Sequence, residues 1–150
     1  MKAIIQRVNY SKLKVNGEIY SEIEKGLMIL LGITHDDTVD DIKWLSNKII
    51  NLRIFNDVHG IMNSSVKDIE GDIQVVSQFT LHAQTKKGNR PSYTQAAKGE
   101  FAEKKYNMFI DEIRTLFNKK IKTGKFGADM QINFENDGPV TIIIDSKNKL

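Results

Sequence analysis

The sequence predicts a single mixed α/β domain with β-hairpins and two main helices. Strand-like runs and two segments with helical periodicity alternate along the chain without the regular strand–helix repeat of a doubly wound sheet. The 150 residues contain no internal repeat, low-complexity segment or linker. We therefore expect one domain over residues 1–150, long enough to bury a core.

The first part of the chain is predicted to form strands. Alternating side chains indicate one strand over Ala3–Val8 and a second that includes Leu13 and Val15. Asn16-Gly17 is a strong signal for a hairpin, with Glu18–Ile23 as the return strand. Leu27–Ile33 has no polar alternation, which is typical of a strand buried on both faces.

Helical spacing follows, and strands return at the end of the chain. Thr38 to Asp41 has the character of a capping box, and Ile42, Leu45, Ile49 and Leu52 continue a helical stripe. The other expected elements are a strand over Asp72–Phe79, a helix over Glu100–Lys120, and strands over Ala128–Glu135 and Val140–Asp145.

Composition excludes several classes of protein. The chain has no cysteine and three scattered histidines, His35, His59 and His82, so we expect no disulfide and no metal site. No glycine-rich nucleotide loop is present, and we expect no cofactor. No apolar run could span a membrane and the first residues do not resemble a signal peptide, so we expect a cytoplasmic protein with no membrane partner. A net charge of +3 and a pI near 9.0 permit an anionic partner.

Asn136–Thr141 is the most informative stretch. Pro139 is one of two prolines and stands directly before the strand-like run Val140–Ile144. Proline cannot donate to a strand ladder, and the bond before it is the type in which the cis form is cheap, about 0.5–1 kcal/mol above trans. Gly138-Pro139 is therefore a candidate for a rigid backbone segment that presents its carbonyl groups in a fixed direction. The alternative is an ordinary turn that leads into a strand.

Polar side chains gather where the strand 72–79 enters a loop. In an extended chain, Ser77 and Phe79 share one side, while Gln78 and Thr80 share the other. Strand ends that enter loops often carry binding groups. The alternative is that Ser77 and Thr80 cap local backbone groups while Gln78 lies in solvent. His82 would lie on the same side as Thr80, but such close sequence placement argues against a nucleophile–base dyad.

A basic loop comes directly afterwards. Lys86, Lys87 and Arg90 stand in a short segment with a glycine and a proline, a composition that suits phosphate contact. A solvated surface is the alternative. A second basic cluster surrounds Gly124 and consists of Lys119, Lys120, Lys122 and Lys125. Few aromatic residues are interleaved with either cluster, so a base-stacking platform is not supported.

Two of these motifs, Ser77–Thr80 and Asn136–Thr141, together resemble the D-aminoacyl-tRNA deacylase family. Further similarity lies in Arg7-Val8, Asn51–Phe55, Arg90–Ser92 and Phe126–Met130, and it extends along essentially the whole chain. The chain departs from the family pattern at Ser11-Lys12-Leu13, where Ala-Ser-Val is usual, and at His82, where tyrosine is common. Both departures lie outside the two main motifs.

The resemblance implies a layered α/β fold with curved mixed sheets and a homodimer with two active sites at its interface. Gly138-Pro139 would be a cis pair that reaches into the partner's pocket, recognises the D-aminoacyl group and excludes L side chains. Arg7 would fix this pair, and Met130 would contact the substrate.

The same resemblance implies the chemistry. Main-chain N–H groups near Phe79 and Thr80 would hold the ester carbonyl, and Ser77 and Gln78 would shape the pocket. The expected reaction is hydrolysis of D-aminoacyl-tRNA, with glycyl-tRNA mischarged on alanine tRNA as a second substrate. Since the chain offers Thr80 no convincing base, we favour water assisted by the tRNA 2′-hydroxyl over Thr80 as nucleophile. A threonine-dependent hydrolase and a non-catalytic tRNA-binding module remain alternatives, and DNA is not an expected partner.

Overall fold

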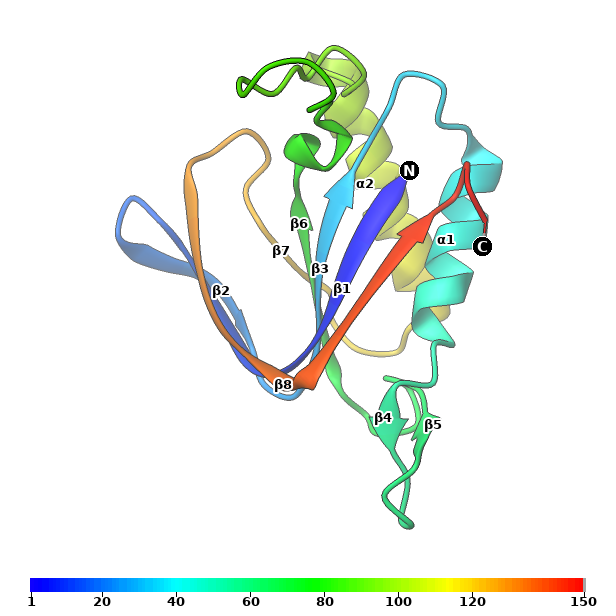
Figure 1. Cartoon of the computed structure of the whole chain (residues 1–150). Coiled ribbons are helices and arrows are strands. Elements are labelled where there is room, and N and C mark those ends of the chain that lie inside the picture. Colours follow the sequence, from blue (N-terminus) through cyan, green and yellow to red (C-terminus); the bar gives the residue numbers. More distant parts are fainter. Residues whose placement is uncertain (150) are drawn as a thin grey trace.

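A six-stranded mixed sheet carries both helices of the protein on one face (Figure 1). The computed structural model describes residues 1–149. The strand order is β2-β1-β3-β6-β7, and β8 pairs with the other edge of β1. β1 is antiparallel to β2, β3 and β8, whereas β3–β6 and β6–β7 are parallel. The strands are β1 (Lys2–Val15), β2 (Glu18–Ile23), β3 (Gly26–Gly32), β6 (Asp72–Ser77), β7 (Lys122–Thr123) and β8 (Met130–Asp145).

The helices bury one face of this sheet. α1 (Val39–Ile50) begins at a capping box between Thr38 and Asp41, as predicted, and packs with α2 (Gly99–Leu116) against the sheet. The main apolar core lies between these layers. A short hairpin of β4 (Phe55–Asn56) and β5 (Met62–Ser64) projects away from the rest of the chain (Figure 1). Within residues 1–149, no helix is both long and apolar enough to cross a membrane.

The sheet curves back over its own helix-free face. Asn16 and Gly17 both have positive φ, 53° and 80°, as a tight hairpin turn requires, so the predicted β1–β2 hairpin is confirmed. Buried Gln74 of β6 accepts a hydrogen bond from Ser11 Oγ at 2.6 Å and donates one to Ser21 Oγ at 2.8 Å. These bonds link the distal half of β1 and β2 to β6. A second apolar cluster fills the curve and contains Val8, Ile23, Met28, Leu30 and Phe134.

Two expected pairs of strands are single long strands. The prediction of a break between Val8 and Leu13 is wrong, because β1 continues through this stretch as a ladder with β8. The two strands expected over 128–135 and 140–145 are likewise one strand, β8. Their polar residues alternate on an exposed face and do not mark loops. Pro139 does not end β8, because it lies in a segment that leaves the ladder locally.

Other boundaries differ by a few residues. α2 ends at Leu116 and not at Lys120, because Phe117 is extended and buried, which directs the chain towards β7. Leu52 lies beyond the end of α1. β6 ends at Ser77, and Phe79–His82 form a 3-10 turn, η1. β4, β5 and β7 were not predicted, since two or three residues carry no readable periodicity.

Candidate active site

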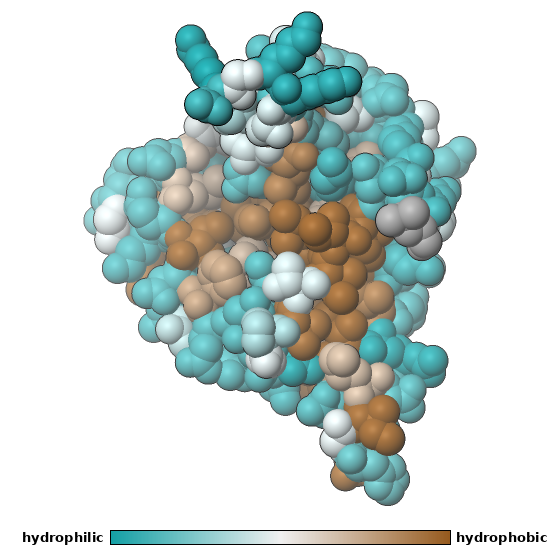
Figure 2. All heavy atoms as spheres, in the orientation of Figure 1, coloured by the Kyte–Doolittle hydropathy of each residue, from teal (hydrophilic) through white to brown (hydrophobic). Residues whose placement is uncertain are grey.

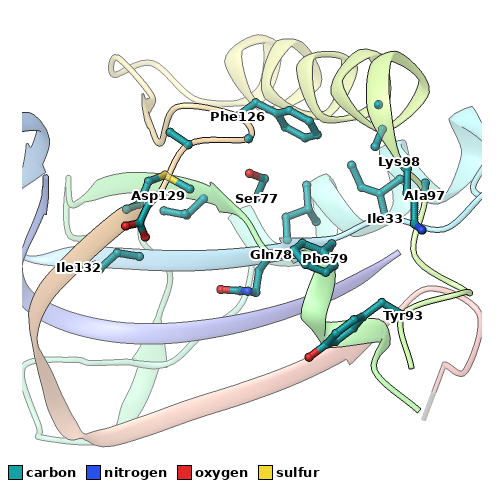
Figure 3. A pocket seen from close by; sticks show the side chains of 17 residues that line it. Ile33, Ser77, Gln78, Phe79, Tyr93, Ala97, Lys98, Phe126, Asp129 and Ile132 are labelled. Carbon is teal, nitrogen blue, oxygen red and sulfur yellow. The ribbon is translucent and has the colours of Figure 1, made fainter. Parts of the chain in front are cut away.

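A cleft of about 630 Å³ opens where β6 ends (Figure 3). Its base is formed by Ser77, and its walls come from η1, the start of α2 and the segment that leads into β8. The lining is mainly apolar, with a few polar groups, as is usual for small-molecule sites. Besides Ser77, the lining residues are Leu31, Ile33, Val76, Gln78, Phe79, Tyr93, Ala97, Lys98, Gly99, Ala102, Phe126, Gly127, Ala128, Asp129, Met130 and Ile132.

The Ser77–Thr80 motif forms the edge of the cleft. The Gln78 N–H donates to Leu31 O at 2.8 Å, which fixes the end of β6 against β3 before the chain turns into η1. Ser77, Gln78 and Phe79 line the cleft, whereas Thr80 does not. Gln78 Nε2 donates to Thr80 Oγ1 at 2.6 Å. Within residues 1–149, no side chain caps the first backbone N–H groups of η1, which begins directly after Gln78. The turn therefore leaves backbone donors beside the cleft.

The expected extended geometry after Ser77 is wrong. Because Phe79–His82 are helical, Thr80 and His82 do not share one side as alternate strand residues do. His82 is buried, and a Cβ placed on Gly32 would lie 3.0 Å from its imidazole ring. Its Nε2 has no hydrogen-bond partner within residues 1–149. The one side chain there that bonds Thr80 Oγ1 is the Gln78 amide, which is not a base.

Aromatic rings form two walls of the cleft, and only Phe79 among them was predicted as a site residue. Phe79 is 54% exposed and meets Tyr93 edge to face, with ring centroids 5.2 Å apart. Phe126 lies on the opposite side of the cleft, and its ring centroid is 5.7 Å from that of Tyr106. The Tyr106 hydroxyl donates to Val75 O at 2.7 Å, and burial raises the pKa of Tyr106, so this donor stays protonated. Tyr106 thereby ties α2 to β6 beneath the cleft.

Charged side chains flank the cleft on opposite sides. Asp129 precedes β8, and Lys98 precedes α2 (Figure 3). Both are exposed, and neither forms an ion pair within the described chain. No cluster of three or more metal-binding side chains occurs among residues 1–149.

Gly138 and Pro139 lie in a bulge of β8. Gln6 pairs with Thr141, and Val8 pairs with Asn136. One residue of β1, Arg7, therefore lies opposite four residues of β8, and residues 137–140 leave the ladder. The Gly138–Pro139 peptide bond is cis, and both residues are exposed. Gly138 has φ +117°, and a Cβ there would lie 2.9 Å from the Arg7 guanidinium. This position therefore requires glycine.

Arg7 holds this bulge from the helix-covered side of the sheet. Its Nε donates to Asp137 O at 3.2 Å and lies 3.1 Å from the Asp137 carboxylate. Its Nη1 donates to Ile54 O at 2.7 Å. The Arg7 side chain is 8% exposed, and its bond to Ile54 O is buried, whereas the Asp137 side chain is 34% exposed. Arg7 thus connects the bulge to the base of the β4–β5 hairpin.

The bulge and the cleft lie towards opposite ends of the sheet. Arg7 pairs with Leu27, which pairs with Ile73, four residues before Ser77 on β6. At ~3.3 Å per residue the two levels are about 13 Å apart. Arg7, Gly138 and Pro139 are absent from the lining of the cleft, whereas Met130 belongs to it. Within one chain the fold therefore does not bring the two motifs together.

The basic loop stands above the cleft. Mutual backbone hydrogen bonds between Gln84 and Ser92 close it, and Tyr93 then enters the cleft wall. Lys86, Lys87 and Arg90 are exposed and form no ion pair within residues 1–149. Hydrophilic side chains project from the top of the molecule in Figure 2, where Figure 1 places this loop. In the second basic cluster, Lys119 is already engaged, because it forms an ion pair with Asp72 and donates a hydrogen bond to the Glu70 carbonyl.

Part of the helix-free face of the sheet, around Ile4, Leu30 and Ile143, is apolar. Ile143 of β8 is 68% exposed, and its neighbour across the ladder, Ile4, is half-buried. Leu30 of β3 continues this row beside Ile4. Figure 2 shows a broad hydrophobic surface over these strands. A surface of this kind on a protein is typical of an interface.

Comparison with known proteins identifies the family. A family model described as D-Tyr-tRNA(Tyr) deacylase matches residues 4–145. The chain belongs to the D-Tyr-tRNA(Tyr) deacylase family. It is 58% identical to the D-aminoacyl-tRNA deacylase of Flavobacterium psychrophilum and 56% identical to that of Flavobacterium johnsoniae, in each case over 99% of both chains. Among solved structures, the c-Myc DNA unwinding element binding protein is similar, with a TM-score of 0.92 and 44% identity over 97% of this chain and 98% of that one.

Proposed function

We propose that this chain hydrolyses the ester bond of D-aminoacyl-tRNA in active sites that two copies of the chain build together. Family membership supports the reaction class, a hydrolase that acts on the ester of an aminoacyl-tRNA. The observation that carries the shared site is the separation of the Gly138–Pro139 bulge from the cleft of its own chain.

The cleft supplies the groups that bind the ester. Ser77 and Gln78 shape its base, Met130 contacts the aminoacyl group, and the uncapped N–H groups at Phe79 and Thr80 hold the ester carbonyl. Such donors stabilise the oxyanion that forms in the transition state, and a single donor lowers the activation free energy by roughly 2.7–4 kcal/mol. An aminoacyl ester is already activated, so a site built from backbone groups is sufficient.

The stereochemical filter comes from the partner copy. Gly138-Pro139 of one protomer enters the other protomer's cleft, where its carbonyl groups face the α-carbon of the aminoacyl group. A main-chain wall rejects an L side chain by steric clash and accepts different D side chains, because it does not read their identity. Glycine has no side chain to reject, which supports glycyl-tRNA on alanine tRNA as a second substrate.

Water assisted by the 2′-hydroxyl of the terminal adenosine carries out the hydrolysis. Within residues 1–149 the Thr80 hydroxyl is bonded by the Gln78 amide and by no basic side chain, which argues against this hydroxyl as the nucleophile. The 2′-hydroxyl stands beside the ester on the same ribose and needs no protein group to reach it. The tRNA itself contacts Lys86, Lys87 and Arg90 through its phosphates.

The test compares substrates that carry the two enantiomers of one amino acid. The protein is incubated separately with D-tyrosyl-tRNA and L-tyrosyl-tRNA, and release of the amino acid is followed. We expect hydrolysis of the D form and protection of the L form. Equal release of both would contradict the filter. Salt-sensitive binding of tRNA without any release would instead identify a non-catalytic tRNA-binding module.

A further inference from the structure

We propose that Gln6, Asn136 and Thr141 form a positioning cluster that sets the direction in which Gly138-Pro139 projects. This inference rests on the proposed function, in which the bulge acts as the stereochemical filter. The three side chains do not touch the substrate. Their role is to hold the two ends of the bulge at a fixed separation and orientation.

The cluster is a closed triangle of hydrogen bonds. Asn136 Nδ2 donates to Gln6 Oε1 at 2.8 Å and to Thr141 Oγ1 at 3.1 Å, and Thr141 Oγ1 also donates to Gln6 Oε1. Asn136 is the last residue paired with β1 before the bulge, and Thr141 is the first residue paired after it. The triangle therefore joins the two points at which β8 leaves and re-enters the ladder.

The cluster lies on the other face of β1 from Arg7. Successive residues of a strand point to opposite faces, so Gln6 faces away from the side chain of Arg7. Arg7 fixes the middle of the bulge through Asp137, and the cluster fixes its ends. Since residues 137–140 have no ladder partner on β1, these side-chain contacts replace the bonds that normally orient a strand.

Selectivity should depend on this arrangement more strongly than stability does. Thr141 is exposed and Gln6 and Asn136 are half-buried, so losing one of their bonds removes little buried surface. A steric filter, in contrast, depends on placement, since a shift of about 1 Å can change a rate by roughly a hundredfold. A bulge free to rotate about its ends no longer keeps its carbonyl groups against the α-carbon.

Near-isosteric variants test the cluster. Thr141→Val removes the hydroxyl and keeps a β-branched side chain that suits a strand. Gln6→Met keeps an unbranched chain of similar length. Tyr10→Phe is the matched control, because it removes another polar contact between β1 and β8, the 3.3 Å bond to Asn133, away from the bulge. Thr141→Ser restores the hydroxyl and serves as the rescue variant.

The readout is the ratio of kcat/KM for D-tyrosyl-tRNA to that for L-tyrosyl-tRNA, with unfolding temperature and oligomeric state measured alongside. We expect Thr141→Val and Gln6→Met to lower this ratio about tenfold to a hundredfold, and Tyr10→Phe and Thr141→Ser to leave it within about twofold. If one variant fails to fold, the other decides the outcome.

An unchanged ratio in a folded Thr141→Val or Gln6→Met protein would overturn the cluster's role. Pro139→Ala separates this failure from a failure of the proposed function. If Pro139→Ala changes the ratio while the cluster variants do not, the cluster alone is refuted. If the wild-type protein does not distinguish D from L, both proposals fall.

Discussion

At the scale of single residues, the proposed function depends on backbone geometry more than on reactive side chains. Gly138 occupies a conformation and a space that exclude any other residue, and Thr80 lacks the base that a nucleophile needs. Asp129 and Lys98 supply charge at the cleft but no acid–base pair. Substitutions at backbone-directing residues should therefore change selectivity, while those at reactive-looking ones should change little.

Pro139→Ala should weaken the rejection of L substrates more than it weakens folding. Proline restricts φ to about −65°, and alanine frees that angle in a segment that has no ladder partner. We expect hydrolysis of L-tyrosyl-tRNA to rise about tenfold or more relative to the D form. Kinetics on both substrates, together with sedimentation, provide the measurement. An unchanged chirality preference in an intact dimer would refute the role of this residue.

Thr80→Val should keep most of the activity. Loss of a true nucleophile lowers kcat by about 10⁴-fold or more, whereas loss of a hydroxyl that accepts a hydrogen bond from Gln78 should lower it by roughly tenfold or less. Steady-state kinetics with D-tyrosyl-tRNA distinguish these outcomes. Thr115→Val, on the exposed surface of α2, controls for the substitution itself. A collapse of activity in the Thr80 variant alone would establish the threonine mechanism.

At the scale of elements, each segment of the proposed active site is attached to a regular strand. β6 delivers Ser77, and η1 turns immediately after it. The β8 bulge is fixed to β1 by Arg7. The start of α1 is held by a carboxylate. Asp41 accepts hydrogen bonds from the Thr38 N–H at 2.8 Å and from Lys147 Nζ at 2.7 Å. This carboxylate joins the start of α1 to the segment after β8.

Asp41→Asn should therefore reduce stability in a pH-dependent manner. Burial disfavours the Asp41 carboxylate, but bonds from Lys147 and Thr38 outweigh it and lower the pKa of Asp41 below the unfolded value of about 3.9. The contribution of Asp41 to stability is therefore complete above the unfolded pKa, and it is lost as the pH falls from that pKa towards the lower pKa of the folded state. We expect a loss of about 1–3 kcal/mol in the free energy of unfolding at pH 7.

Urea unfolding of the wild type and the Asp41 variant at several pH values measures this difference. The two stability curves should converge as the pH falls below about 4. A difference that stays constant from pH 7 to acid would show that the Asp41 charge is not its source. Asp40→Asn, on the exposed side of the same first turn, is the matched control.

At the scale of the whole molecule, one chain has a cleft, a bulge that lies apart from it, and an uncovered apolar face. The cleft and the bulge stand towards opposite ends of the sheet, and Ile143 is exposed on the face opposite the helices. In the proposed shared site, a second copy covers this face, and each bulge enters the other copy's cleft. Assembly and selectivity should then be lost together.

Ile143→Glu should separate the two copies and abolish deacylation in parallel. A carboxylate placed on a buried apolar interface has no partner, and its desolvation opposes association. Sedimentation and D-tyrosyl-tRNA kinetics on the same samples are the measurement. Val39→Glu, an exposed apolar position on α1, should leave both properties unchanged. A fully active monomer of the Ile143 variant would contradict the shared site.

The sequence was informative where side-chain patterns reflect local physics. The Asn16-Gly17 hairpin, the capping box at Thr38 and the two amphipathic helices were predicted, since each depends on residues close together in the chain. The Ser77–Thr80 and Asn136–Thr141 motifs led to the family. Tyr93 and Phe126 were missed as cleft residues, although they lie in or beside segments that resemble the family, because similarity in sequence does not show which side chains line a cavity.

The sequence alone therefore determined the α/β class, most of the elements and the family resemblance, because periodicity, turn chemistry and short motifs are local properties. Tertiary structure decided the rest. Only the register between β1 and β8 shows that Pro139 lies in a bulge inside one long strand, and only the packing around Gly138 shows the clamp by Arg7. These depend on residues about 130 positions apart, and contact at that separation leaves no local pattern for the sequence to display.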